Sequence, residues 1–103
     1  GEDSFVLRDR IQLSEDGFLV VVVGLDEFTA ELASLEIIAK GLSLSEEATA
    51  EAKANIVNAL KQLDLKKIKD EQQLSGLIRR NVRNYVQKAT KKNPMILPII
   101  MVI

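Results

Sequence analysis

Residues 93–103 read NPMILPIIMVI, and after Pro94 no charged residue interrupts this apolar run. Successive side chains of a β-strand point to opposite faces of a sheet, so a strand that is apolar at both parities has apolar surface on both sides. Such a strand requires cover above and below it. A domain of this size rarely supplies both covers. The sequence therefore predicts that one cover comes from another protein surface.

A second apolar run lies earlier in the chain. Residues 18–25 read FLVVVVGL and lie between Gly17 and the acidic pair at positions 26–27. The run is rich in β-branched residues, which predicts a central strand that is again apolar on both faces. Residues 35–40 alternate more regularly between apolar and polar side chains. They predict a second, partly exposed strand that a hairpin joins to the first.

Two helices are predicted before the terminal strand. The first covers about residues 46–63, where apolar side chains recur at helical spacing after a cap formed by Ser43 or, as a rival, by Ser45. The second covers residues 71–92 and ends before Pro94. The order β-β-α-α-β predicts an α+β domain of two layers, in which both helices pack on one face of a three-stranded sheet.

This arrangement leaves the other face of the sheet without cover. Four or five aliphatic side chains left in water would forgo burial worth roughly 1.5–3 kcal/mol each, on the order of 10 kcal/mol together. That sum is comparable with the stability of a whole domain. Residues 17–103 are expected to form this domain, and residues 1–16 are expected to be an entry linker.

The composition argues against an independent enzyme. The 103 residues include no histidine and no cysteine, which removes the usual zinc ligands and the commonest general base. No apolar stretch approaches the roughly 18–20 residues that span a bilayer, so we expect a soluble domain without a membrane partner. The acidic N-terminus lacks the order of a signal peptide. We therefore expect no catalytic residue, metal ligand or cofactor in this chain.

The formal net charge of −1 hides a strong asymmetry. Residues 1–60 carry four basic and twelve acidic residues, whereas residues 61–103 carry ten basic and three acidic ones. The second predicted helix places several cations opposite its apolar stripe, either as a solvated surface or as a contact for RNA phosphates. The absence of an interleaved aromatic platform favours the solvated surface. The candidate phosphate contacts are Arg79, Arg80, Arg83, Lys91 and Lys92.

Three segments of the chain resemble one known family. They are VLRDR and LSEDG within residues 6–17, VVVVGLD at residues 20–26, and PMILPIIM at residues 94–101. In this order they are similar to the C-terminal domain of ribonuclease J, a bacterial and archaeal metallo-β-lactamase ribonuclease of the β-CASP type. The resemblance spans essentially the whole chain, and two separate motifs bracket the domain.

The resemblance implies a parent enzyme that cuts RNA endonucleolytically and degrades it from the 5′ end, in cytoplasmic mRNA decay and rRNA maturation, with a two-zinc centre. The zinc ligands of that family belong to a His-x-His-x-Asp-His motif and its companions, which this sequence lacks. The implied role of this domain is to help subunits associate and to support activity. Its implied partners are a second subunit, the catalytic module or both, with RNA as the substrate of the parent.

The terminal strand is either a core strand of its own domain or a contact surface, and the missing cover favours the contact surface. Pro98 supports this, because proline cannot donate a ladder hydrogen bond and indicates an edge strand or a bulge. The sequence does not fix which parity faces outward. We therefore expect glutamate at Ile99 and at Ile100 to differ, one unfolding the domain and the other only blocking association. The interface candidates are Leu97, Ile99, Ile100, Met101, Val102, Val21 and Val23.

Overall fold

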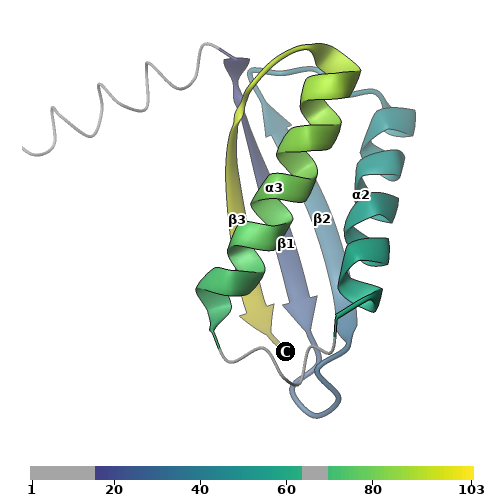
Figure 1. Ribbon diagram of the computed structural model, residues 1–103, viewed down its shortest axis with the longest axis vertical. Coiled ribbons are helices and arrows are strands. Elements are labelled where there is room, and N and C mark those ends of the chain that lie inside the picture. Colours follow the sequence, from purple (N-terminus) through teal and green to yellow (C-terminus); the bar gives the residue numbers. More distant parts are fainter. Residues whose placement is uncertain (1–15, 64–69) are drawn as a thin grey trace, which may run out of the picture.

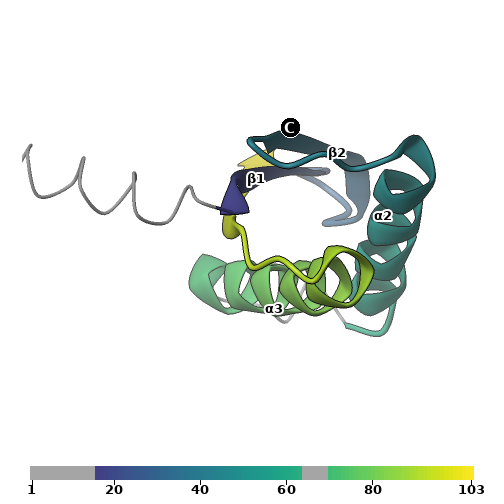
Figure 2. The same ribbon diagram turned by 90° about the horizontal axis from the view of Figure 1, so that it is seen from above.

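The computed structural model describes residues 16–63 and 70–103. The elements follow one another as β1 (Phe18–Leu25), β2 (Leu32–Lys40), α2 (Glu46–Lys61), α3 (Glu71–Thr90) and β3 (Met95–Val102). They form two layers, with the sheet in one and both helices in the other (Figures 1 and 2). The predicted α+β class and element order are confirmed. The predicted linker lies outside the described residues, except for Asp16.

The central strand of the sheet is β1, as the sequence predicts. The strand order is β2-β1-β3, in which β1 pairs with β2 antiparallel and with β3 parallel. The antiparallel pair is a hairpin, which confirms the predicted connection, although β2 begins at Leu32 rather than at the predicted Leu35. The parallel pair requires a crossover, and α2 and α3 supply it, which places both helices on one side of the sheet.

The core lies between the sheet and the helices. Leu19, Val21 and Val23 of β1 have no exposed surface, because they point from the central strand into the helical layer. Each helix contributes one apolar stripe with residues spaced three or four apart. The buried side chains that complete this core are Leu42 before α2, Ala52, Ile56 and Leu60 of α2, Leu74, Ile78, Val82 and Val86 of α3, and Ile96 of β3.

The helix boundaries follow from local capping. Ser45 caps α2, and its hydroxyl accepts a hydrogen bond from the backbone N–H of Ala48 at 3.0 Å. The rival cap is therefore right, and the prediction of Ser43 is wrong. The carboxylate of Asp70 caps α3 by accepting from the N–H of Gln72 at 2.8 Å. At the other end Lys91 adopts a left-handed conformation with φ of 62°, which ends the helix before Pro94. Neither helix is long and apolar enough to cross a bilayer.

The start of β1 depends on a glycine. Gly17 has a φ of +81°, and a Cβ atom there would lie 2.6 Å from the carbonyl oxygen of Lys40. Both the left-handed backbone and this close approach exclude a side chain. By contrast, a Cβ atom at Gly76 of α3 would meet nothing within 4 Å.

Alanine at these two glycines is expected to change stability in opposite directions. Gly17→Ala should lower the free energy of unfolding by at least about 1–2 kcal/mol, the cost of a left-handed conformation alone. Gly76→Ala should raise it by about 0.8–1 kcal/mol, because alanine is the better helix former. Urea unfolding at one fixed protein concentration measures both. Equal midpoints for the two variants would contradict this assignment.

Candidate association surface

The register of the strands separates two faces of the sheet. Val21 pairs with Ile37 and Pro98 on the side of the helices, whereas Val22 pairs with Glu36 and Ile99 on the opposite side. We call this opposite side the outer face. Its apolar side chains are Phe18, Val20, Val22, Ile38, Met95, Leu97, Ile99 and Met101, and its polar ones are Ser34, Glu36 and Lys40.

The outer face is apolar and open among the described residues. Figure 2 shows that α2 and α3 both lie against the other side of the sheet. The exposed fractions are 46% for Ile38, 37% for Leu97, 46% for Ile99 and 43% for Met101. A patch of neighbouring exposed aliphatic side chains is typical of an interaction site.

The structure divides the predicted interface residues into two groups. Leu97, Ile99 and Met101 lie on the outer face, where they stay candidates for an interface. Val21 and Val23 point into the helical layer and have no exposed surface, so their inclusion was wrong. The two groups differ because adjacent residues of a strand point to opposite faces of the sheet.

The last two predicted interface residues share the inward parity. Ile100 pairs with Val23 and packs partly against the core, so it does not lie on the outer face. Val102 pairs with Leu25 on the same side. It is nevertheless 66% exposed, because it ends the strand. The outward parity of β3 is therefore that of its odd-numbered residues.

Five apolar residues of the outer face were absent from the predicted set. Phe18, Val20 and Val22 occupy the outward parity of β1, Ile38 that of β2, and Met95 begins β3. The signal for Val20 and Val22 was present, because the first run is apolar at both parities. Ile38 was the one apolar residue on the polar side of the second predicted strand. It becomes part of a continuous apolar patch only through the pairing of β2 with β1.

The edge of β3 is unsuited to adding another strand. The N–H groups of Met95 and Ile103 donate to Gly17 and Leu25 of the neighbouring chain segment, at 3.1 and 2.8 Å. Odd-numbered amides of β3 therefore turn towards β1, and position 98 turns towards the free edge. Pro98 has no N–H there, which interrupts the row of donors that a further strand would need. The predicted edge position of Pro98 is confirmed.

The opposite edge of the sheet carries a charged side chain. Lys53 of α2 places its Nζ atom 3.6 Å from Oε2 of Glu36. Because α2 lies in the helical layer and Glu36 on the outer face, this ion pair passes around the free edge of β2. Lysine at an edge disfavours strand addition. Association through the face of the sheet is thus favoured over association through either edge.

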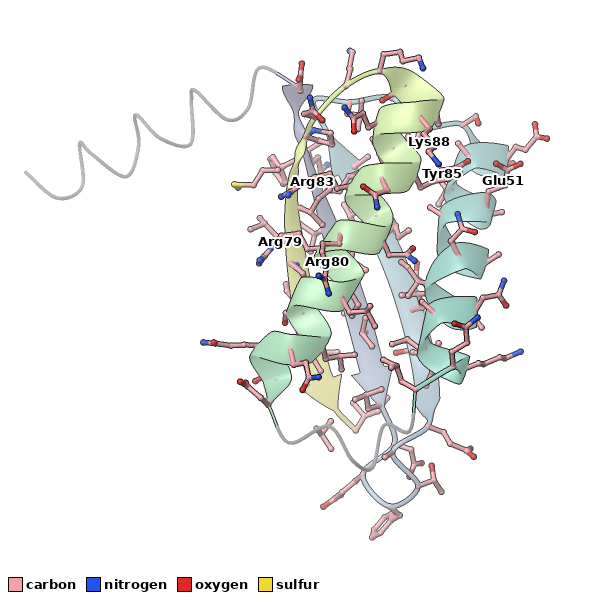
Figure 3. All side chains as sticks on the ribbon, in the orientation of Figure 1. Glu51, Arg79, Arg80, Arg83, Tyr85 and Lys88 are labelled. Carbon is pink, nitrogen blue, oxygen red and sulfur yellow. The ribbon has the colours of Figure 1, made fainter. Side chains whose placement is uncertain are left out.

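The basic side chains of α3 form a separate surface. Arg79, Arg80 and Arg83 are exposed, as predicted, and none has a carboxylate within 4.0 Å among the residues that the structure describes. In Figure 3, Arg79 and Arg83 lie on the side of α3 nearer β3, whereas Lys88 lies on the side of α2. The cations are therefore spread around the helix, and Lys91 and Lys92 follow its end.

Comparison with known proteins supplies the family. The sequence matches the family model "Ribonuclease J C-terminal domain" over residues 5–103. The chain belongs to this family. It is 33% identical over 106 residues to Ribonuclease J2 of Bacillus subtilis (strain 168), and 34% identical over 106 residues to Ribonuclease J 2 of Staphylococcus epidermidis (strain ATCC 12228). These alignments cover 95% and 94% of the chain, but 18% of each relative.

In this ribonuclease J C-terminal domain, a polar contact joins the two helices. The hydroxyl of Tyr85 donates to Oε2 of Glu51 at 2.6 Å (Figure 3). The hydrogen bond to this carboxylate, together with partial burial, raises the pKa of Tyr85 to about 12. The contact joins α2 to α3, and it lies on the side of α3 towards α2, whereas Arg79 and Arg83 lie nearer β3 (Figure 3).

The titration of Tyr85 gives a clean test of this contact, because the chain has one tyrosine and no tryptophan. Phenolate absorbance should titrate near pH 12 in the native domain. Glu51→Gln should bring the pKa down towards the ordinary value of about 10. Since the folded-state pKa is raised, the stability from this bond is complete below about pH 10 and is lost as the pH rises towards 12. An ordinary pKa in the native domain would contradict the hydrogen bond.

The residues of this family domain do not fit a zinc centre. Histidine and cysteine are absent from the whole sequence. In residues 16–63 and 70–103, no three acidic side chains come together in an arrangement that could hold a metal ion. No catalytic step is therefore assigned to this chain.

Proposed function

We propose that this chain is a non-catalytic association domain of a ribonuclease J-type enzyme, and that its outer face contacts another part of the assembled enzyme. The observation that carries this proposal is the apolar outer face, which no described segment of the chain covers. A sheet with helices on only one side leaves its other side exposed to water unless a partner covers it. Membership of the ribonuclease J C-terminal domain family supports a role inside that enzyme.

The parent protein in this proposal is a zinc-dependent ribonuclease. It cuts RNA internally and from the 5′ end, in cytoplasmic mRNA decay and rRNA maturation. The chain spans 18% of the length of its relatives named ribonuclease J2, which leaves the chemistry to residues outside it. The domain contributes by holding a second subunit, the catalytic module or both, and so supports activity through assembly.

The proposal is tested by the molar mass of the chain in solution. The monomer has a mass of 11.4 kDa, and sedimentation equilibrium should show a reversible rise above this value as the concentration increases. Burial of apolar surface drives this association, so added salt should change it little. A constant monomer mass at millimolar concentration would overturn the role in subunit assembly.

A second candidate function is contact with RNA through α3. The observation that favours it is the set of exposed arginines without described carboxylate partners. Such binding would rest on phosphate charge, so its affinity should fall steeply as salt rises. Arg79→Ala combined with Arg83→Ala should then reduce binding of single-stranded RNA and its salt dependence. Salt-independent self-association without RNA binding would leave only the first function.

A further inference from the structure

The charged side chains of the outer face all belong to β2. The register divides the face into four rows across β2, β1 and β3, namely Lys40–Phe18–Met95, Ile38–Val20–Leu97, Glu36–Val22–Ile99 and Ser34–Gly24–Met101. Lys40 and Glu36 are thus two rows apart on one strand, with Ile38 between them. The positions on β1 and β3 in these rows are apolar or glycine.

This spacing of opposite charges is self-complementary. Two identical sheets can pack face to face, about 10 Å apart, when a two-fold axis lies in the plane between them. If that axis crosses the strands at the row of Ile38, β2 of one copy lies over β2 of the other and runs in the opposite direction. Glu36 of each copy then faces Lys40 of the other copy, and Ile38 faces its own equivalent.

The other simple orientation leaves the charges unpaired. An axis parallel to the strands would place β2 of one copy over β3 of the other. Glu36 would then face Ile99, and Lys40 would face Met95. Covering a charge with an apolar side chain and no partner is costly. The charge pattern therefore favours the axis across the strands, which also sets Met95 against Ile99 and Leu97 against its equivalent.

The position of the pair suits a contact at the rim of an interface. Glu36 has a side chain that is 69% exposed, and it lies on a strand at the edge of the sheet. Lys53 adds a third charge beside it, at 3.6 Å. Charged pairs at a rim determine orientation and partner choice more than affinity. The apolar rows would supply the attraction, and the charges would supply the register.

We propose that the outer face binds a second copy of this chain, with the two-fold axis across the strands at Ile38, and that Glu36–Lys40 contacts between the copies fix this orientation. The inference rests on the proposed association function. It adds the identity of the partner, the direction of docking and the residues that select it.

Charge reversal tests the orientation directly. Glu36→Lys and Lys40→Glu should each weaken self-association about tenfold, because two pairs per dimer change from attraction to repulsion. Mixed in equal amounts, the two variants should form heterodimers in preference to either homodimer, since both pairs then regain opposite charges. Combining both substitutions in one chain should restore self-association. Native mass spectrometry with one variant labelled with nitrogen-15 measures the species.

A matched control distinguishes a direct contact between the two copies from a general effect of net charge. Glu47→Lys and Arg80→Glu make the same changes in net charge on the helical layer, and their mixture should show no preference for heterodimers. If a charge reversal disturbs folding, the neutral variants Glu36→Gln and Lys40→Gln test the same contact. Each should weaken association, and the two substitutions in one chain should weaken it no more than either does alone. A wild-type dimer whose reversal variants mix at random overturns this orientation. A monomeric wild type overturns the association function itself.

Discussion

Replacing Ile96 with glutamate is expected to leave the chain unfolded. Ile96 of β3 is 2% exposed and belongs to the core between the sheet and the helices. The substitution loses roughly 1.5–3 kcal/mol of apolar burial. It also buries a carboxyl group without a partner, which costs several kcal/mol more even if the group takes up a proton. The sum reaches the 5–15 kcal/mol that typically stabilises a whole domain.

Circular dichroism and the dispersion of amide proton signals would show this loss of structure. Leu97→Glu is the matched control, because it introduces the same side chain at the next residue, which points to the outer face. Ile100→Glu should be milder than Ile96→Glu, since Ile100 is only partly buried and a carboxylate there can reach water. A cooperatively folded Ile96→Glu variant would refute the inward parity of the even-numbered residues of β3.

Replacing Ile99 with glutamate is expected to separate folding from association. The side chain is 46% exposed on the outer face, so a carboxylate there stays hydrated in the monomer and the fold persists. In an assembly through the outer face the same carboxylate would lose its water. A two-fold axis places the substitution at the interface twice, so the affinity should fall by at least about a hundredfold.

Sedimentation equilibrium with circular dichroism checks both halves of this expectation. Ala54→Glu adds the same charge at an exposed position of α2, in the helical layer, and should keep the molar mass of the wild type. An Ile99→Glu variant that is folded and associates as the wild type does would show that the outer face is not the contact.

Local signals in the sequence were sufficient for most of the fold. Two signals act within one element each, namely the run of β-branched residues at 18–25 and the helical spacing of apolar residues after position 45. Both elements begin where they were predicted, although α2 ends at Lys61 rather than near residue 63. Ser43 and Ser45 lie two residues apart, and both fit the pattern of a residue that caps a helix. The spacing from Ser43 to Glu46 matches a capping box, so the sequence favoured the wrong serine.

The outward parity of β3 was beyond local reasoning. Ile99 and Ile100 have the same chemistry, so hydrophobic alternation, which normally distinguishes the two faces, is absent in this strand. The parallel pairing with β1 decides it, by placing Val23 beside Ile100 and Val22 beside Ile99. That pairing joins residues far apart in the sequence. For the same reason the participation of Ile38 and the complementary spacing of the charges on β2 became visible only with the register.

The most direct test follows the two methionines of the chain, Met95 and Met101, both of which lie on the outer face. Their carbon-13-labelled methyl groups can be observed by NMR in the presence of a soluble paramagnetic probe, at low and at high protein concentration. Burial of the outer face between two copies predicts that both methyl signals become protected from the probe as the concentration rises. Equal accessibility of both methyl groups across the whole range, with a monomer mass throughout, would contradict it.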